Sequence, residues 1–136
     1  MTALMKAARY GYDDIVRILA EKEAGMQDED GETALMYAAD NGHLECVKIL
    51  ASLENSMKNN DGKTALMFAA NNGHLECVKI LAPLEKGMQD KYGETALMYA
   101  AMKGRLECVK ILTPLEKGMK DNRGRTAKSH AFGECE

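Results

Sequence analysis

Cysteine is the side chain in this sequence best suited to act as a nucleophile or a metal ligand. Cys46, Cys77 and Cys108 stand 31 residues apart, and the position 31 residues before the first of them holds Ile15. A position that accepts either isoleucine or cysteine favours a buried apolar side chain over a reactive thiolate. Helical units stacked about 10 Å apart would also keep these thiols out of disulfide range. The pattern therefore predicts free structural cysteines.

Histidine could supply a base or a ligand, and the spacing again argues for structure. His43 and His74 each follow a glycine at the start of an expected helix, where the next unit carries Arg105. A catalytic base rarely tolerates exchange for arginine, so we expect these histidines to have a capping role. His130 and Cys135 form one isolated pair, whereas a metal centre needs three or four ligands. We expect no catalytic residue, no metal and no cofactor.

Methionine, glycine and glutamate recur at fixed offsets as well. Eight of the ten methionines fall on two columns, Met5, Met36, Met67 and Met98, and then Met26, Met57, Met88 and Met119. Such columns indicate scaffold packing rather than a copper site, and Met102, outside both, is a candidate partner contact. The glycines form neither phosphate-loop motif, and Glu45, Glu76 and Glu107 lie on one outer helix face rather than converging as catalytic acids. We therefore expect no enzyme.

Composition and charge limit the kinds of partner and the cellular location that we expect. The chain is 46% hydrophobic and 29% charged, with a formal net charge of -3, as in an ordinary globular domain. This balance does not favour a nucleic-acid or membrane-surface partner. Apolar runs are only a few residues long, and the start of the chain lacks the pattern of a signal peptide. We expect a cytoplasmic protein with no nucleic-acid or membrane partner.

An exact 31-residue repeat organises the whole chain. The dipeptide Thr-Ala begins at Thr2, Thr33, Thr64, Thr95 and Thr126. Repeats at this period indicate a solenoid, in which each small unit is stabilised by stacking on its neighbours. The sequence predicts a single domain over 1–136, with repeats at about 1–31, 32–62, 63–93 and 94–124 and a partial repeat at 125–136.

Each unit predicts two helices and a turn. Thr33 can cap a first helix that Gly42 ends. A second helix is expected from about Leu44 to Leu53, followed by a tight turn over 55–63. In these helices we expect Leu35, Ala38, Ala39, Val47, Leu50 and Leu53 to face inward, and Glu45, Lys48 and Glu54 to face outward.

These residues resemble the ankyrin-repeat family. Thr64-Ala65-Leu66-Met67-Phe68-Ala69-Ala70 corresponds to its T-P-L-H-x-A signature, and the Ala-Ala-x-x-Gly-His run and the Asp-x-x-Gly-x-Thr run, as in 90–95, are specific in combination. The resemblance covers nearly all the chain. It implies an all-α solenoid of helix-turn-helix units with β-turn fingers, which presents a concave groove to a protein partner and has no catalysis of its own.

Two departures from the family pattern affect the expected details. Alanine and methionine replace the family's proline and histidine, so Met36, Met67 and Met98 must pack where that histidine forms hydrogen bonds. The unit is also two residues shorter than the usual repeat, and Pro83 and Pro114 should end or bend the second helix early. This short form is similar to the large ankyrin-repeat families of flagellated protists, some of which follow a kinase domain.

Differences between the units predict where a partner binds. Units 33–63 and 64–94 differ at ten positions, and units 64–94 and 95–125 at nine. The changes gather in the fingers and along the first helices, which line the groove in ankyrin proteins. The predicted partner-binding residues are Tyr37, Asp40, Asn41, Asp61, Lys63, Phe68, Asn71, Asn72, Lys91, Tyr92, Tyr99, Met102, Lys103, Arg123 and Arg125.

The finger charges suggest how a partner is oriented. Glu29, Asp30 and Glu32 are acidic, whereas Arg123 and Arg125 are basic. We expect a partner with an opposed charge gradient. We also expect Phe68, Tyr92 and Tyr99 to serve as central anchors, because aromatic residues are common binding hot spots.

The two ends of the array suggest further possibilities. Lys128 stands in the column of Leu4, Leu35, Leu66 and Leu97, so a helix over 126–132 should face water and cap the stack. At the first unit, exposed Ala3, Ala7, Ile15 and Leu19 would allow weak end-to-end self-association. Alternatively, the chain is a regulatory or targeting fragment of a larger protein such as an ankyrin-repeat kinase, because it starts directly at a first helix.

Overall fold

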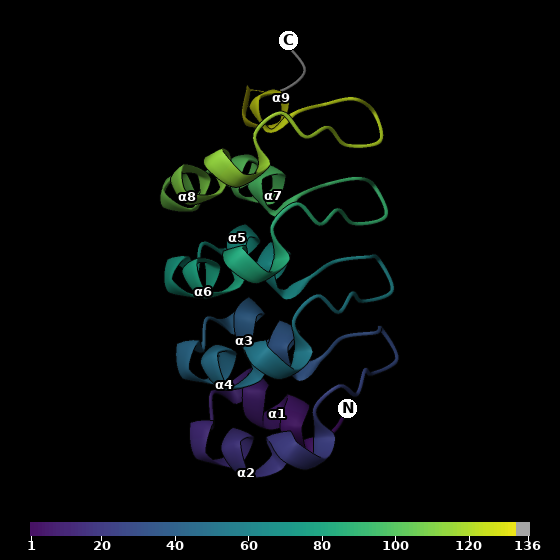
Figure 1. Cartoon of the computed structure of the whole chain (residues 1–136), viewed down its shortest axis with the longest axis vertical. Helices are drawn as coiled ribbons and strands as arrows, with labels where there is room; N and C mark the ends of the chain where they lie inside the picture. The colour runs from purple at the N-terminus through teal and green to yellow at the C-terminus, as the bar shows by residue number, and fades with distance from the viewer. Residues whose placement is uncertain (133–136) are drawn as a thin grey trace.

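The computed structural model describes the backbone of residues 1–132 and the side chains of residues 1–129. Within this part every regular element is an α-helix, and pairs of helices stack along one axis with all the fingers on one side (Figure 1). The helices are α1 (Ala3–Tyr10), α2 (Asp13–Glu23), α3 (Ala34–Asn41), α4 (Leu44–Glu54), α5 (Ala65–Asn72), α6 (Leu75–Glu85), α7 (Ala96–Met102), α8 (Leu106–Glu116) and α9 (Ala127–Phe132). The predicted all-α solenoid is confirmed.

The first helix of a repeat is fixed by local caps, as its sequence predicts. In α3 the Thr33 hydroxyl accepts a hydrogen bond of 3.2 Å from the Met36 amide, and Gly42 ends the helix in the left-handed conformation. Met36 is buried as expected, and its sulfur also accepts a long hydrogen bond of 3.5 Å from the Thr33 amide. The methionine therefore completes a capping box as well as packing.

The second helices bury Val47 and Leu50 as predicted, but the buried stripe ends on a different residue. Leu53 is 51% exposed, whereas Glu54 is only 2% exposed, so the expected orientations of these two residues are wrong. Cys46, Val47 and Leu50 are buried on the same side of α4 as Glu54. Glu54 is four residues from Leu50 and seven from Val47, so it lies at the centre of the face that these two residues bury, whereas Leu53 lies at its edge.

The buried glutamates join each repeat to the one before it. Glu54 accepts a 2.8 Å hydrogen bond from the Leu35 amide, at the start of its own repeat, and another of 2.8 Å from the Gly25 amide of the preceding repeat. Glu85 and Glu116 make the equivalent pairs of bonds. Burial raises the pKa of these carboxyl groups, against the effect of the backbone hydrogen bonds, which lower it.

Proline does not shorten the second helix. α6 contains Pro83 and α8 contains Pro114, yet both helices have the same 11 residues as α4, which has serine at that position. Each proline removes one intrahelical donor, and both prolines are exposed at the surface. The prediction that proline ends the helix early is therefore wrong.

The cysteine column is part of the core. Cys46, Cys77 and Cys108 are buried and free, as predicted. The Cys46 thiol also donates a 3.1 Å hydrogen bond to Asp13 of the preceding repeat. Burial, and then the Asp13 carboxylate, raise the pKa of Cys46 to about 12, and burial raises the pKa of Cys77 to about 11. A thiol held protonated in this way is a poor nucleophile.

The ends of the stack differ from its middle. At the first repeat Ile15 is 46% exposed, as predicted, but Ala7 is buried against α3, so the expectation that it is exposed is wrong. At the other end α9 packs on α7, and Lys128 is exposed to solvent as expected. In the described part of the chain, no helix has the length and apolar character needed to cross a bilayer.

Candidate protein-binding surface

The fingers and first helices form one surface, which we call the finger face. Each finger is a tight loop (28–32, 59–63, 90–94 and 121–125), and neighbouring fingers are joined through their backbones. The amides of Asn60, Lys91 and Asn122 each donate a 2.9 Å hydrogen bond to a carbonyl of the preceding finger. The four loops therefore form a continuous ladder along one side of the stack (Figure 1).

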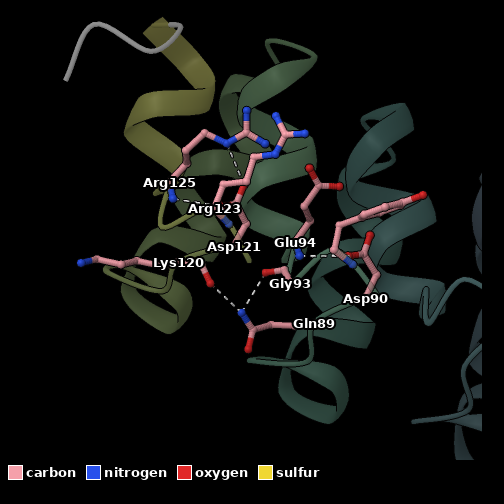
Figure 2. A network of polar contacts seen from close by, with 9 residues as sticks. Gln89, Asp90, Gly93, Glu94, Lys120, Asp121, Arg123 and Arg125 are labelled. Carbon is pink, nitrogen blue, oxygen red and sulfur yellow. Dashed lines mark hydrogen bonds and ion pairs between the residues drawn. The ribbon is translucent and has the colours of Figure 1, made fainter.

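A carboxylate or amide at the base shapes each finger. Asp90 accepts hydrogen bonds of 2.9 Å from the amides of Tyr92 and Glu94, and Asp28, Asn59 and Asp121 do the same in their own fingers. Figure 2 shows this arrangement in the third and fourth fingers, where the Gln89 side chain donates to the Gly93 carbonyl and to the Lys120 carbonyl just before the next finger. The finger face is thus ordered before any partner arrives.

Tyrosine hydroxyls attach the fingers to the first helices. Tyr37 donates a 2.5 Å hydrogen bond to Asp28, and Tyr99 donates to Asp90. Burial, and then the neighbouring aspartate, raise the pKa of both phenols. Where the finger base is Asn59, the helix carries Phe68 in place of tyrosine. The first helix therefore carries tyrosine where the finger base is aspartate, and phenylalanine where it is asparagine.

An amino group links two repeats across the face. The Lys63 ammonium lies 5.8 Å from the ring centroid of Phe68 and 5.5 Å from that of Tyr99. Both rings are partly buried, as is Tyr37. Of the three expected aromatic anchors, Tyr92 is the one that stands out into solvent, with 57% of its surface exposed.

The polar residues of the first helices divide into two groups. Asn72 donates to the Asp40 side chain (2.7 Å) and to its carbonyl (2.9 Å), and Asn41 donates to the Tyr37 carbonyl. Met102 and Lys103 at the end of α7 are exposed, and Asn71 is partly buried. Among the predicted residues of the first helices, Asp40 and Asn72 therefore connect two repeats, whereas Met102 and Lys103 are exposed.

The charged predicted residues include two intramolecular pairs. Lys91 of the third finger forms a 2.8 Å ion pair with Asp61 of the second. Arg125 lies 2.9 Å from the buried Asp121 carboxylate. Burial on its own would raise the pKa of Asp121, but hydrogen bonds from Arg125 and from the Arg123 amide lower it to about 2.

Exposed charge remains at the two ends of the finger face. Glu29 and Asp30 are exposed on the first finger and Arg123 on the fourth. The third finger carries two more acidic residues, Asp90 and Glu94, which the expected charge gradient does not include. Asp90 is buried and accepts a hydrogen bond from Tyr99. A polar cavity of about 210 Å³ lies between the last two fingers, and its lining is Tyr92, Glu94, Asp121, Asn122, Arg123 and Arg125.

The histidine side chains bind backbone carbonyls of the preceding repeat. His43 Nε2 lies 2.9 Å from the Arg9 carbonyl, and His74 Nε2 lies 3.0 Å from the Asp40 carbonyl, both in the preceding repeat. Neither side chain caps its own helix, so the predicted capping role is wrong. Because the acceptor is a carbonyl, the ring nitrogen must carry a proton, and Arg105 replaces it by donating from Nε to the Asn71 carbonyl.

No group of three or more possible ligands for a metal ion occurs among the residues that the structure describes. The pair considered in the sequence, Cys135 and the side chain of His130, lies outside them.

Comparison with known proteins identifies the repeat. A family model described as ankyrin repeats (3 copies) matches residues 1–58 and 52–124. A search of curated proteins gives no match. Ankyrin repeats are generally protein–protein interaction modules and are typically noncatalytic. The family match spans most of the sequence and agrees with the stacked helix pairs and fingers, so the chain belongs to the ankyrin-repeat family.

Proposed function

We propose that this chain is a noncatalytic interaction module that binds a protein partner through the finger face. The observation that carries the proposal is the contrast between surfaces of nearly identical repeats. The outer helices α6 and α8 differ at one residue of 11, Ala82 against Thr113. By comparison, three of the five positions of the third finger (91, 92 and 94) differ from their counterparts one unit later.

Rigidity supports this use of the surface. The backbone ladder between fingers, the aspartate-shaped loops and the tyrosine bonds to the first helices hold the face in one arrangement. A partner that docks on a stiff surface loses little chain entropy there, which leaves more of the contact energy for affinity. Tyr92, Met102, Lys103 and Arg123 are exposed on this face and are the side chains most available for contact.

Charge supports an orientation for the partner. We place a basic part of the partner against Glu29 and Asp30 and an acidic part against Arg123 and Arg125. Reversing Arg123 and Arg125 to glutamate should weaken binding, and most strongly at low salt. Arg125 also pairs with Asp121, so Arg123→Glu alone is the cleaner test. Unchanged affinity for both variants would contradict this orientation.

A pull-down from cell extract tests the proposal. The bait is compared with a variant carrying Tyr92→Ala, Met102→Ala and Arg123→Ala, whose side chains are all exposed. A matched control carries Leu53→Ala, Leu84→Ala and Lys79→Ala on exposed positions of the outer helices. A partner retained by the control and lost by the finger-face variant supports the proposal. Equal recovery by both variants would place binding on another surface.

A further inference from the structure

A large cavity lies at the C-terminal end of the stack, away from the finger face. It has a volume of about 670 Å³, a mostly apolar lining, and walls from α7, α8 and the start of α9. The residues that define this end groove are Leu97, Ala101, Leu106, Val109, Thr113 and Gly118. This volume is within the range of binding clefts.

The end groove continues an interface that the chain already uses three times. α2 packs against α4, α4 against α6, and α6 against α8. In the described part of the chain no further outer helix covers α8. Leu106 is consequently 62% exposed, whereas Leu44 and Leu75, its counterparts in α4 and α6, are partly buried. The same apolar face that holds an outer helix elsewhere is therefore presented to solvent here.

A hydrogen-bond donor marks one end of this groove. The amides of Gly25, Ser56 and Gly87 each donate to a buried glutamate of the next outer helix, at 2.8, 2.8 and 2.9 Å. Gly118 is the next member of that column and lines the groove, and no residue within the described range accepts from its amide. Lys117 and Lys128 also line the groove, and both are exposed. The groove thus combines an apolar floor with positive charge and a donor suited to a carboxylate.

We propose that the end groove binds a single amphipathic helix of a partner protein. The helix carries an apolar stripe of the outer-helix kind and a glutamate near its end that accepts from the Gly118 amide. The outer helices have 11 residues, a length of about 16 Å, which sets the expected size of the bound helix. This binding is separate from that of the finger face.

The arrangement of α9 favours one helix over a second copy of the chain. α9 packs on α7 as α7 packs on α5, so it occupies the position of the next first helix. A second copy stacked end to end would bring α1 into that same position together with α2. Because α9 already holds that position, a single helix fits the groove better than a second copy does.

A peptide from the chain itself provides the probe. A fluorescent peptide of residues 43–56, which spans α4, is titrated with the whole 136-residue chain under reducing conditions, and anisotropy and helical circular dichroism are recorded. We expect saturable binding with a gain of helicity. A peptide with Glu54→Ala should bind about tenfold more weakly, because it lacks the carboxylate.

Matched variants of the protein locate the binding. Leu106→Asp alters an exposed groove residue and should abolish peptide binding without changing the thermal midpoint, whereas Leu84→Asp on the exposed side of α6 should leave binding unchanged. The finger-face triple variant should also bind the peptide normally, so failure of one proposal is separable from failure of the other.

Three results would overturn the end-groove proposal. The first is no saturable binding, and the second is binding that Leu106→Asp leaves intact. The third comes from sedimentation of the unlabelled protein: concentration-dependent association that Leu106→Asp removes would make a second copy the occupant.

Discussion

The third and fourth outer helices have almost the same sequence and very different surroundings. α6 and α8 share ten of 11 residues, yet Val78 is buried and Val109 is partly exposed. α6 lies between α4 and α8, whereas α8 is covered on one side only in the described structure. The comparison shows that burial in this array is a property of the interface between repeats, as expected for a solenoid.

The largest expected effect concerns the glutamates that join repeats. Glu85→Ala leaves two amides without their acceptor, Leu66 and Ser56, and should lower the free energy of unfolding by about 3 kcal/mol. Glu23→Ala affects only the Leu4 amide and should cost about 1 kcal/mol. Urea unfolding of both variants measures the difference. Equal losses would show that the link to the preceding repeat contributes nothing.

Glycine substitutions test the comparison at the helix ends. Gly42 and Gly104 both have a positive φ, but an added Cβ at Gly42 would lie 2.6 Å from the His74 ring, whereas nothing lies within 4 Å at Gly104. Gly42→Ala should therefore cost about 2 kcal/mol and Gly104→Ala about 1 kcal/mol. Thermal unfolding provides the readout, and a larger loss for Gly104→Ala would be inconsistent with the inter-repeat contact.

Truncation of valine to alanine compares how much side-chain burial contributes to stability in the two outer helices. Val78→Ala removes two methyl groups from a fully buried site and should cost about 1.5 kcal/mol. Val109→Ala removes them from a partly exposed site, so about half that loss is expected. The two variants are compared by urea unfolding, with Leu84→Ala on the exposed side of α6 as a control. Identical losses would contradict the burial difference.

The last effect is confined to acid pH. The pKa of Asp121 is lowered to about 2 in the folded chain, so its contribution to stability is present above the unfolded pKa and is lost as the pH falls toward 2. Burial raises the pKa of Glu85, so the pH-dependent part of its effect has the opposite sign: stability falls as the pH rises from the unfolded pKa through the folded pKa. Asp121→Asn should flatten the fall in stability between about pH 4 and pH 2. An unchanged acid slope would argue against the Asp121 assignment.

Local sequence signals predicted most of the fold. Thr33 and Gly42 act within one turn of chain, so their capping roles are readable from the sequence. Glu54 could have been found as well, because it lies seven residues after Val47 on the buried stripe, but its charge suggested the surface. The role of His43 was not readable, because its acceptor, the Arg9 carbonyl, comes from another repeat.

The candidate site was predictable as a surface rather than as a set of available side chains. Differences between units pointed to the fingers and first helices, and the structure brings those residues to one face. That Tyr99 is bonded to Asp90, or Arg125 to Asp121, depends on loop geometry that spacing does not specify. The end groove depends on which neighbour is present, and so no motif within one repeat reveals it.

Hydrogen exchange of the native protein tests the central claim most directly, because α6 and α8 serve as near-identical probes of two environments. Amide exchange measured by mass spectrometry should show stronger protection in Leu75–Glu85 than in Leu106–Glu116. Adding the α4 peptide should raise protection in α8 and leave α6 unchanged. Equal protection of the two helices in the free chain would contradict the claim that burial and stability come from the neighbouring repeat.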